Sequence, residues 1–599
     1  MRSPTPLDTR MAEPTRVPGK IFQAAPSSIT MHRILTIPEL VLNIFQNIIT
    51  TKPDGVPRID RVTLASLARC CRRFREPALE SMYAEIRNLH WLIKCMPRDL
   101  WEDNGKKLVF LRNMNDHDWS IFCRYARYVK ILYISVYQAS QIDLGVYEQL
   151  GKYLIRFDSR EALFPRLHTL QSNETSDQIV SLMWHLLKSR LTSLILMVSN
   201  GGILRCVLAR LSPPPGISSP PDPPSPPLTT SLKTLGLSDS HRPGPDITDT
   251  ICDTFKKFHH LTVVRCDKIT ESAAKHFSEM PSLQFLHFTM PKDLSFNSIR
   301  DNRPSEMFVA LQRLHIHSET LDACLRFQHL TRSSSLRSIT YTVDDERTAD
   351  RWKEIFTSLA ATPSYHDLSV LDLTELTFAG KDYTDEYILD FPKLKPLLQF
   401  KNLTRLKIET FCTFKLDNAA IKEMAQAWPR LLSLDLSYRE DGWELEPEIT
   451  LHGLLPLLRN CPGLQHLGIV VDGRYITANP HKLPGGGVRN TSLTTLWLAD
   501  SPITRPPLVA AFLSSVAPNI RNIMSWDTEP LALRPRARKY KRRWKIVKRM
   551  IPVLSMARTQ ERNGCRGGGL DSDPEALLSE SETDPEPAED PMDESDDDD

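Results

Sequence analysis

The chain has 599 residues, a hydrophobic fraction of 41% and a charged fraction of 25%, values that are typical of soluble proteins. This length exceeds what one small hydrophobic core organises, so we expect several cores or one repeat array. The formal net charge of +2 indicates no particular class of partner, and 45 prolines against 23 glycines are unusual for a compact single-domain enzyme.

The eleven cysteines are scattered and form no paired C-x-x-C motif, so the sequence indicates neither a disulfide framework nor a zinc site. No stretch approaches the roughly 18 consecutive apolar residues of a membrane span. Residues 1–30 lack the apolar segment of a secretion signal and are expected to be disordered. We therefore expect an intracellular protein, cytoplasmic or nuclear or both.

The first predicted element is a helix within residues 34–49, where Thr36 can cap and Pro38 suits the first turn. Its apolar residues recur at spacings of three and four, which predicts one buried face. These residues are Ile37, Leu40, Val41, Ile44, Phe45 and Ile48. Because Leu42 and Ile49 lie outside that face, the helix is apolar over most of its circumference and must bury both sides.

Two further helical segments follow the connection 50–62. The first runs from Leu64 to Phe74, and Pro77 is expected to interrupt the pattern before a third segment that reaches Ile93. Three short helices bury too little surface to be secure alone. We therefore expect this helical module, residues 31–95, to need a partner or a neighbouring domain.

In the stretches IPELVLNIF (37–45) and LASLARCCRRFREPALESMY (64–83), the module resembles an F-box. Phe74 and Tyr83 stand where the family has tryptophans. The resemblance implies docking on a Skp-type adaptor, which links the chain to a cullin ubiquitin ligase. It assigns the adaptor contacts to Ile37, Pro38, Leu40, Ile44, Ile48, Leu67, Cys71 and Phe74. The alternative interpretation is that these helices form a small cap for the domain that follows.

Over residues 125–530 a short phrase, L-x-x-L-x-L with other apolar residues substituting, recurs about every 30 residues. It starts at Val129, Leu167, Leu191, Leu232, Leu261, Leu283, Leu311, Leu336, Leu368, Leu403, Leu431, Leu464, Leu493 and Ile520. Several copies follow a proline by two residues, and a helical run precedes that proline. These runs cover residues 273–280, 419–428, 451–461 and 508–517.

A helix, a proline stop and a short apolar strand resemble the unit of an irregular leucine-rich repeat. Because a single unit cannot bury its own leucines, we expect the units to stack into a curved solenoid. The predicted fold class is an α/β repeat with parallel strands inside and helices outside, preceded by the three-helix module. Residues 213–227 hold nine prolines and are expected to project as a disordered loop, whose P-x-x-P spacings are compatible with SH3 or WW modules.

Within each phrase, the residue between the last two apolar positions is expected to face the concave surface, because side chains alternate along a strand. The chemistry at these positions is mixed, which suits recognition of a client protein through a few aromatic or arginine anchors. The candidates are Arg265, His287, His315, Asp372, Lys407, Asp435 and Trp497. We expect only a minority of them to contact the client.

Ten of the sixteen residues from 534 to 549 are Lys or Arg, and apolar spacing predicts an amphipathic helix over residues 534–556. Its apolar face consists of Tyr540, Trp544, Val547, Ile551 and Leu554. Three interpretations stay open: a cap for the last repeat, a nuclear-localisation signal within 538–549, or a contact with nucleic acid, anionic membrane or a calmodulin-like partner. The acidic tail, residues 560–599, is expected to be disordered.

The sequence offers no catalytic constellation. The glycine triplets at 485–487 and 567–569 lack the setting of a phosphate loop, and His259 and His260 are better explained as surface residues than as metal ligands. We therefore expect a non-catalytic chain without cofactor or metal, with no membrane partner and with nucleic acid disfavoured. Two functions remain: a substrate receptor of an SCF-type (cullin) ubiquitin ligase, or a repeat scaffold with no ligase link.

Overall fold

The structure is a computed structural model of the chain, and it forms two compact units, Met1–Ser193 and Leu194–Asp599, each taken by itself below. The structure describes residues 35 and 37–563 except 52–56, 106, 135–141, 157–162, 174–181, 183–185, 188–189, 199–206, 209–210, 212–227, 240–244, 292–293, 295, 297–306, 329, 332–334, 345–347, 363–364, 377–384, 437–442, 444, 477–482, 529–530 and 532–535. Three segments expected to be disordered lie outside the described residues: residues 1–30, the proline-rich loop and residues 564–599 of the acidic tail.

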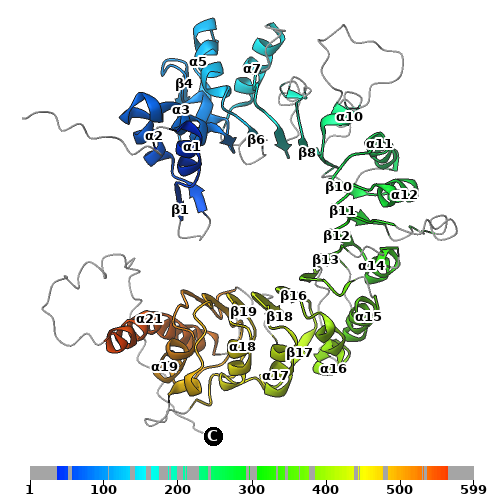
Figure 1. The fold of residues 1–599 in the computed structure, drawn as a ribbon, viewed down its shortest axis with the longest axis vertical. Coiled ribbons are helices and arrows are strands. Elements are labelled where there is room, and N and C mark those ends of the chain that lie inside the picture. The colour runs from blue at the N-terminus through cyan, green and yellow to red at the C-terminus, as the bar shows by residue number, and fades with distance from the viewer. Residues whose placement is uncertain are drawn as a thin grey trace, which may run out of the picture. The chain divides into compact units, whose positions relative to one another are not determined.

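The first unit begins with three helices, α1 (Pro38–Gln46), α2 (Arg61–Cys70) and α3 (Arg72–Tyr83) (Figure 1). Between α1 and α2 the chain forms a two-stranded antiparallel ribbon of β1 (Ile49–Thr51) and β2 (Pro57–Ile59). The Asp60 carboxylate caps α2 by accepting hydrogen bonds from the backbone N–H groups of Val62 and Thr63. The predicted helices are therefore present, with α2 beginning earlier than its apolar spacing suggested.

The expectation that Pro77 interrupts the helical pattern is wrong. The chain breaks instead at Cys71, whose extended backbone (φ −155°, ψ 163°) separates α2 from α3, and Pro77 lies buried inside α3. Proline fixes φ near the helical value, so the helix continues through Pro77 although its ring nitrogen cannot donate a backbone hydrogen bond. The third segment is also shorter than expected, because α3 ends at Tyr83 and the chain then enters a strand. The cap position of α1 is Ile37 and not Thr36, and no side chain caps it.

The rest of the first unit places three strands in a parallel sheet of order β3-β6-β7. Its elements are β3 (Glu85–Ile86), α4 (His90–Ile93), β4 (Trp101–Asp103), β5 (Leu108–Phe110), α5 (Asp116–Ala126), β6 (Ile131–Ile134), α7 (Leu144–Arg156) and β7 (Thr169–Ser172). An Arg112–Asp118 ion pair of 2.6 Å and a capping box at Asn115 fix the start of α5. The first two L-x-x-L-x-L phrases form β6 and β7.

The second unit continues the alternation of strand and helix. Its main sheet has the order β8-β9-β10-β11-β12-β13-β14-β16-β18-β19-β20-β21, and every pairing whose register is defined is parallel. The strands are β8 (Ser193–Val198), β9 (Thr234–Asp239), β10 (Val263–Lys268), β11 (Phe285–Met290), β12 (Arg313–Ser318), β13 (Ser338–Val343), β14 (Val370–Glu375), β16 (Arg405–Glu409), β18 (Ser433–Leu436), β19 (His466–Gly468), β20 (Thr495–Trp497) and β21 (Asn522–Met524).

Helices connect these strands. They are α10 (Leu228–Ser231), α11 (Pro245–Phe255), α12 (Glu271–Glu279), α14 (Leu321–Gln328), α15 (Ala349–Ala360), α16 (Phe391–Leu394), α17 (Asn418–Ala427), α18 (Leu455–Asn460), α19 (Pro506–Val516) and α21 (Ala537–Arg562). The 3-10 turns are η3 (Asp385–Tyr387), η4 (Lys395–Gln399), η5 (His452–Leu454) and η6 (Pro484–Gly487). Apart from the main sheet, a two-stranded parallel ribbon joins β15 (Ile388–Asp390) to β17 (Thr413–Lys415).

The repeat phrase predicts every one of these main-sheet strands, because each strand begins two residues after a phrase starts. In the phrase at Leu311 the three apolar side chains, Leu311, Leu314 and Ile316, are at most 1% exposed. The helices end where the prolines predict. For example, α17 starts at an Asp417 cap and ends at Ala427, two residues before Pro429. The structure thus confirms an α/β solenoid with a parallel sheet.

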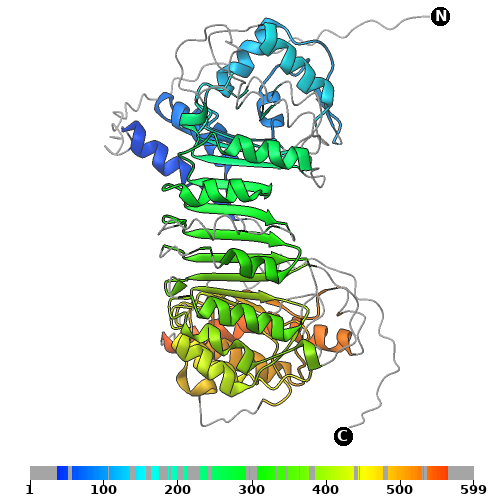
Figure 2. The same cartoon turned by 90° about the vertical axis from the view of Figure 1, so that its right-hand side faces the viewer.

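Within the second unit, the strands line the inner side of a curve and α11, α12, α14 and α15 lie on its outer side (Figure 1). Figure 2 shows β10 to β13 stacked as successive rungs. Because side chains alternate along each strand, one set of residues points into the leucine core and the other onto the concave face. The fold therefore presents a long row of strand residues on one surface.

Candidate protein-binding surfaces

The first candidate surface lies on α1. Ile37, Leu40 and Ile44, here named the α1 stripe, are 43%, 42% and 45% exposed, whereas Val41 and Phe45 are 2% and 4% exposed. The sequence pattern placed all five on one core face, and the structure divides that face in two. An apolar arc this wide exceeds what the three-helix core covers, so its edge stays accessible among the described residues.

The buried side of α1 packs against both other helices of the module. Val41, Phe45, Leu64 and Ala78 form its core, and the Phe45 and Phe74 rings meet edge to face with centroids 5.4 Å apart. Partly buried side chains surround that core: Leu35, Ile48, Ile59, Leu67, Ala68, Phe74 and Met82. Three of the predicted adaptor contacts, Ile48, Leu67 and Phe74, therefore also hold the module together.

The remaining predicted adaptor contacts sit at the module surface. Pro38 is exposed at the first turn of α1, next to the stripe, and Cys71 is partly exposed at the break between α2 and α3. The structure thus leaves Ile37, Pro38, Leu40 and Ile44 exposed along the length of α1.

The second candidate surface is the concave row of the second unit. All seven residues predicted to face it lie at the same register position of the parallel sheet. Arg265 pairs with His287 and His287 with His315, while Asp372 pairs with Lys407 and Lys407 with Asp435. Thr340, Gly468 and Trp497 complete the row. The phrase therefore selected residues that form one row of register partners; their contact with a client stays a prediction.

An aromatic and cationic cluster occupies the row at β10 to β12. The Phe285 ring lies 5.1 Å from the Arg265 guanidinium carbon and 4.9 Å from that of Arg313, and the His315 ring meets it edge to face at 4.8 Å. Burial, together with the charges of Arg265 and Arg313, lowers the pKa of His315 to about 4. Burial likewise lowers the pKa of His287 to about 4. Both imidazoles are therefore neutral at pH 7.

A second cluster, at β14 to β18, contains compensated charges. The Lys407 ammonium lies 2.7 Å from a Glu409 carboxylate oxygen. Burial opposes the charged form of Lys407, but the Glu409 hydrogen bond and the charges of Asp372 and Asp435 outweigh it and raise the pKa of the lysine. Asp435 is only 5% exposed, and a Cβ at Gly468 would lie 2.5 Å from its Oδ1 atom. Glycine at 468 therefore makes room for this carboxylate.

Further along the row, the His466 and Trp497 rings meet edge to face with centroids 4.4 Å apart. Phe285, Arg313, Glu409 and His466 were not predicted as surface candidates. The first three lie two residues from a predicted candidate, and His466 lies two residues from Gly468 of the same row. The strand alternation that selected one column could therefore have found the neighbouring column.

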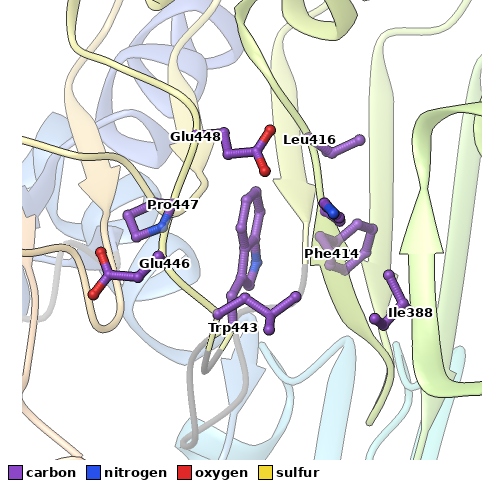
Figure 3. A pocket seen from close by; sticks show the side chains of 9 residues that line it. Ile388, Phe414, Leu416, Trp443, Glu446, Pro447 and Glu448 are labelled. Atoms are coloured by element: carbon purple, nitrogen blue, oxygen red, sulfur yellow. The ribbon is translucent and has the colours of Figure 1, made fainter. Parts of the chain in front are cut away.

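A cavity of about 230 Å³ lies beside the β15–β17 ribbon, with Phe414, Leu416 and Trp443 as apolar walls and Glu446 and Glu448 at its rim (Figure 3). Its walls have structural roles. Trp443 is 1% exposed and donates from Nε1 to the Leu436 carbonyl oxygen at 3.2 Å, and its backbone carbonyl oxygen accepts from the Thr413 hydroxyl at 2.8 Å. At the rim, Glu446 pairs with Arg474 at 2.5 Å.

Helix α21 covers α19. Trp544, Val547 and Ile551 of the predicted apolar face are buried, and Trp544 Nε1 donates to the Ser501 carbonyl oxygen at 2.9 Å. Arg558 donates to the Ala511 carbonyl oxygen at 2.9 Å and to the Ser514 hydroxyl. These contacts favour the cap among the three interpretations of the basic helix, while its cationic side stays exposed.

The part of the chain that the structure describes contains no group of three or more His, Cys, Asp or Glu side chains suited to hold a metal ion. Among the same residues, no helix combines the length and the apolar character needed to cross a bilayer.

No protein-family model matches the sequence, and no curated protein matches it either. Among solved structures, the chain is similar to the yeast Rad7 and Elc1 complex, with a TM-score of 0.35 and 13% sequence identity. This similarity covers 69% of the present chain and 91% of the other. So low a TM-score carries no argument about partners or function, and the fold assignment rests on the sheet topology.

Proposed function

We propose that this chain is a non-catalytic substrate receptor of an SCF-type ubiquitin ligase. The α1 stripe docks a Skp-type adaptor, which recruits the cullin complex, and the concave row binds a client protein. The observation that carries the proposal is the exposure of Ile37, Leu40 and Ile44 on a helix whose sequence resembles the start of an F-box. Three accessible aliphatic side chains on one helix face are typical of a binding site.

The size of the stripe indicates how much more the adaptor must contact. Burying a fully exposed aliphatic side chain contributes about 1.5–3 kcal/mol, so three that are less than half exposed contribute roughly 2–4 kcal/mol together. Association costs about 4–15 kcal/mol, which exceeds that gain. The adaptor must therefore also contact Pro38 and the partly exposed residues of α2 and α3, among them Cys71.

In this function the chain acts by bringing the client protein close to the ubiquitin-loaded enzyme. Holding a client and a ubiquitin-loaded enzyme in one assembly raises their effective concentration, so transfer accelerates without a catalytic group on the receptor.

The adaptor site is tested by a double substitution, Leu40→Asp with Ile44→Asp, in the full chain. Two carboxylates on the stripe should abolish co-purification with a Skp-type adaptor, because charges buried without partners are costly. Circular dichroism should change little, since both residues lie outside the module core. The matched control is Leu483→Asp, the same change at a residue of the second unit that is 72% exposed.

Undiminished co-purification of the adaptor with the double variant would overturn the proposed docking surface. Failure of the unaltered chain to bind any Skp-type adaptor would overturn the ligase function itself, and the chain would then be a repeat scaffold.

A further inference from the structure

Two arginines on the concave face converge on one aromatic ring. Arg265 on β10 and Arg313 on β12 flank Phe285 on the strand between them, and both guanidinium carbons lie within 5.1 Å of its centroid. The two cations are therefore no more than about 10 Å apart. Both arginine side chains are exposed, while the ring beneath them is 3% exposed.

Neither arginine has an acidic partner among the residues that the structure describes. The other concave cation of the row, Lys407, differs in this respect because Glu409 lies 2.7 Å away. The two guanidinium groups also repel each other, since the charge of Arg313 adds to burial in lowering the pKa of Arg265. A pair of like charges without counterions is costly, and a bound anion relieves that cost.

The surroundings add hydrogen-bond donors without adding charge. His315 contacts the Phe285 ring and lies 5.7 Å from His287, centroid to centroid, and both imidazoles are neutral at pH 7. Each neutral imidazole keeps one N–H that can donate to an oxygen. The cluster therefore offers two forked cations and two neutral donors on one open strand surface.

We propose that Arg265, Arg313 and the flanking histidines bind a phosphorylated side chain in an extended segment of the client protein. A phosphate monoester carries nearly two negative charges at pH 7, which matches two guanidinium groups better than a single carboxylate does. Guanidinium groups bind phosphate oxygens in a bidentate manner, and the aromatic ring holds both in place. This inference rests on the proposed function, because it names the chemistry of the client.

The rest of the row favours a protein segment over a nucleic acid. Asp372, Glu409 and Asp435 lie on β14 to β18 of the same sheet, a few strands from the arginine pair. A continuous phosphate backbone laid along the row would meet these carboxylates, whereas a peptide with one phosphate need not. Neighbouring strands are about 4.8 Å apart, so about five residues of extended peptide span the distance from β11 to β14.

The test uses the full chain and two probes: a peptide library with a fixed central phosphothreonine or phosphoserine, and the same library without phosphate. The phosphorylated library should bind at least about ten-fold more tightly, because charge-assisted hydrogen bonds to two guanidinium groups are lost without the phosphate. Substitution of both arginines, Arg265→Gln with Arg313→Gln, should abolish that difference. Arg→Lys at both positions should retain part of it.

Arg405→Gln provides the matched control. Arg405 is exposed on β16 and occupies the same register row as Arg313, which pairs through Ser338 and Val370 to Arg405. This variant should bind the phosphorylated library as the unaltered chain does. Equal affinity for the two libraries would overturn the inference, and so would retention of the difference in the double Gln variant.

Tighter binding of a mixed-sequence single-stranded oligonucleotide than of the phosphorylated library would also overturn it. Adaptor co-purification is measured on the same preparations. If the unaltered chain binds the adaptor but does not prefer the phosphorylated library, only this inference is wrong. If the unaltered chain does not bind the adaptor, the proposed function is wrong.

Discussion

Helices α1 and α19 pose the same physical problem and differ in how it is solved. Both have more apolar side chains than one packing face accommodates. On α19, Val509, Phe512 and Leu513 are buried, and α21 lies over the helix. On α1, the stripe residues remain more than 40% exposed. An apolar helix with an intramolecular cover is a structural element, and one whose cover is absent from the described residues is a candidate for docking.

The largest expected effect tests the covered helix. Trp544→Ala removes a side chain that is 2% exposed together with its hydrogen bond to Ser501, so the free energy of unfolding should fall by about 3–5 kcal/mol. Urea unfolding of the full chain, followed by tryptophan fluorescence and circular dichroism, measures it. Ile546→Ala, on the exposed side of α21 at 39% exposure, serves as the control and should cost less than about 0.5 kcal/mol. Equal effects of the two changes would mean that α21 is not a cap.

A smaller effect is expected from the hydrogen bonds that fasten the same helix. Arg558→Ala removes the arginine's hydrogen bonds to the Ala511 carbonyl oxygen and to the Ser514 hydroxyl, which should cost about 1–2 kcal/mol; the Ala511 oxygen keeps the Ser514 hydroxyl as a donor at 3.2 Å. Hydrogen exchange of α21 should accelerate more than that of β12, since the loss is local. If both elements exchange faster to the same degree, the helix unfolds only with the whole unit and the contact has no separate role.

The smallest change in the free energy of unfolding is expected for a residue of the α1 stripe. Ile44→Ala should change the free energy of unfolding by less than about 0.5 kcal/mol, yet weaken adaptor binding, because the residue lies on the exposed stripe. The adjacent Phe45→Ala should instead cost about 3–5 kcal/mol, since that ring packs on Phe74 in the module core. Thermal unfolding and adaptor pull-down of both variants separate the two roles. Similar behaviour of the two variants would contradict the division of the α1 face.

The strands of the solenoid could be predicted from the sequence because their signal is local. Each phrase contains its own alternation, and the strand starts at a fixed position within it. The division of α1 was not predictable, since which part of a wide apolar arc is covered depends on how α2 and α3 pack against it. The position of Pro77 was not predictable for the same reason. Proline locally favours the end of a helix, yet Pro77 lies buried inside α3.

The surface clusters were predictable only in part. The row containing Arg265 and His315 follows from alternation within single strands. The convergence of Arg265 and Arg313 on Phe285 involves two columns and three strands, so it depends on the register between repeats. Nothing in the sequence pattern indicated the β15–β17 ribbon, which forms from short segments outside the phrases.

The constant offset between each phrase and its strand has an evolutionary consequence. Insertions between phrases lengthen the connecting segments but leave the alignment of neighbouring rungs unchanged, because every rung positions itself from its own residues. A lineage can therefore add, remove or enlarge connections, and even whole rungs, while the side chains that already meet a ligand on the inner surface keep their spacing. Recognition can diversify in this architecture without rebuilding the framework that supports it.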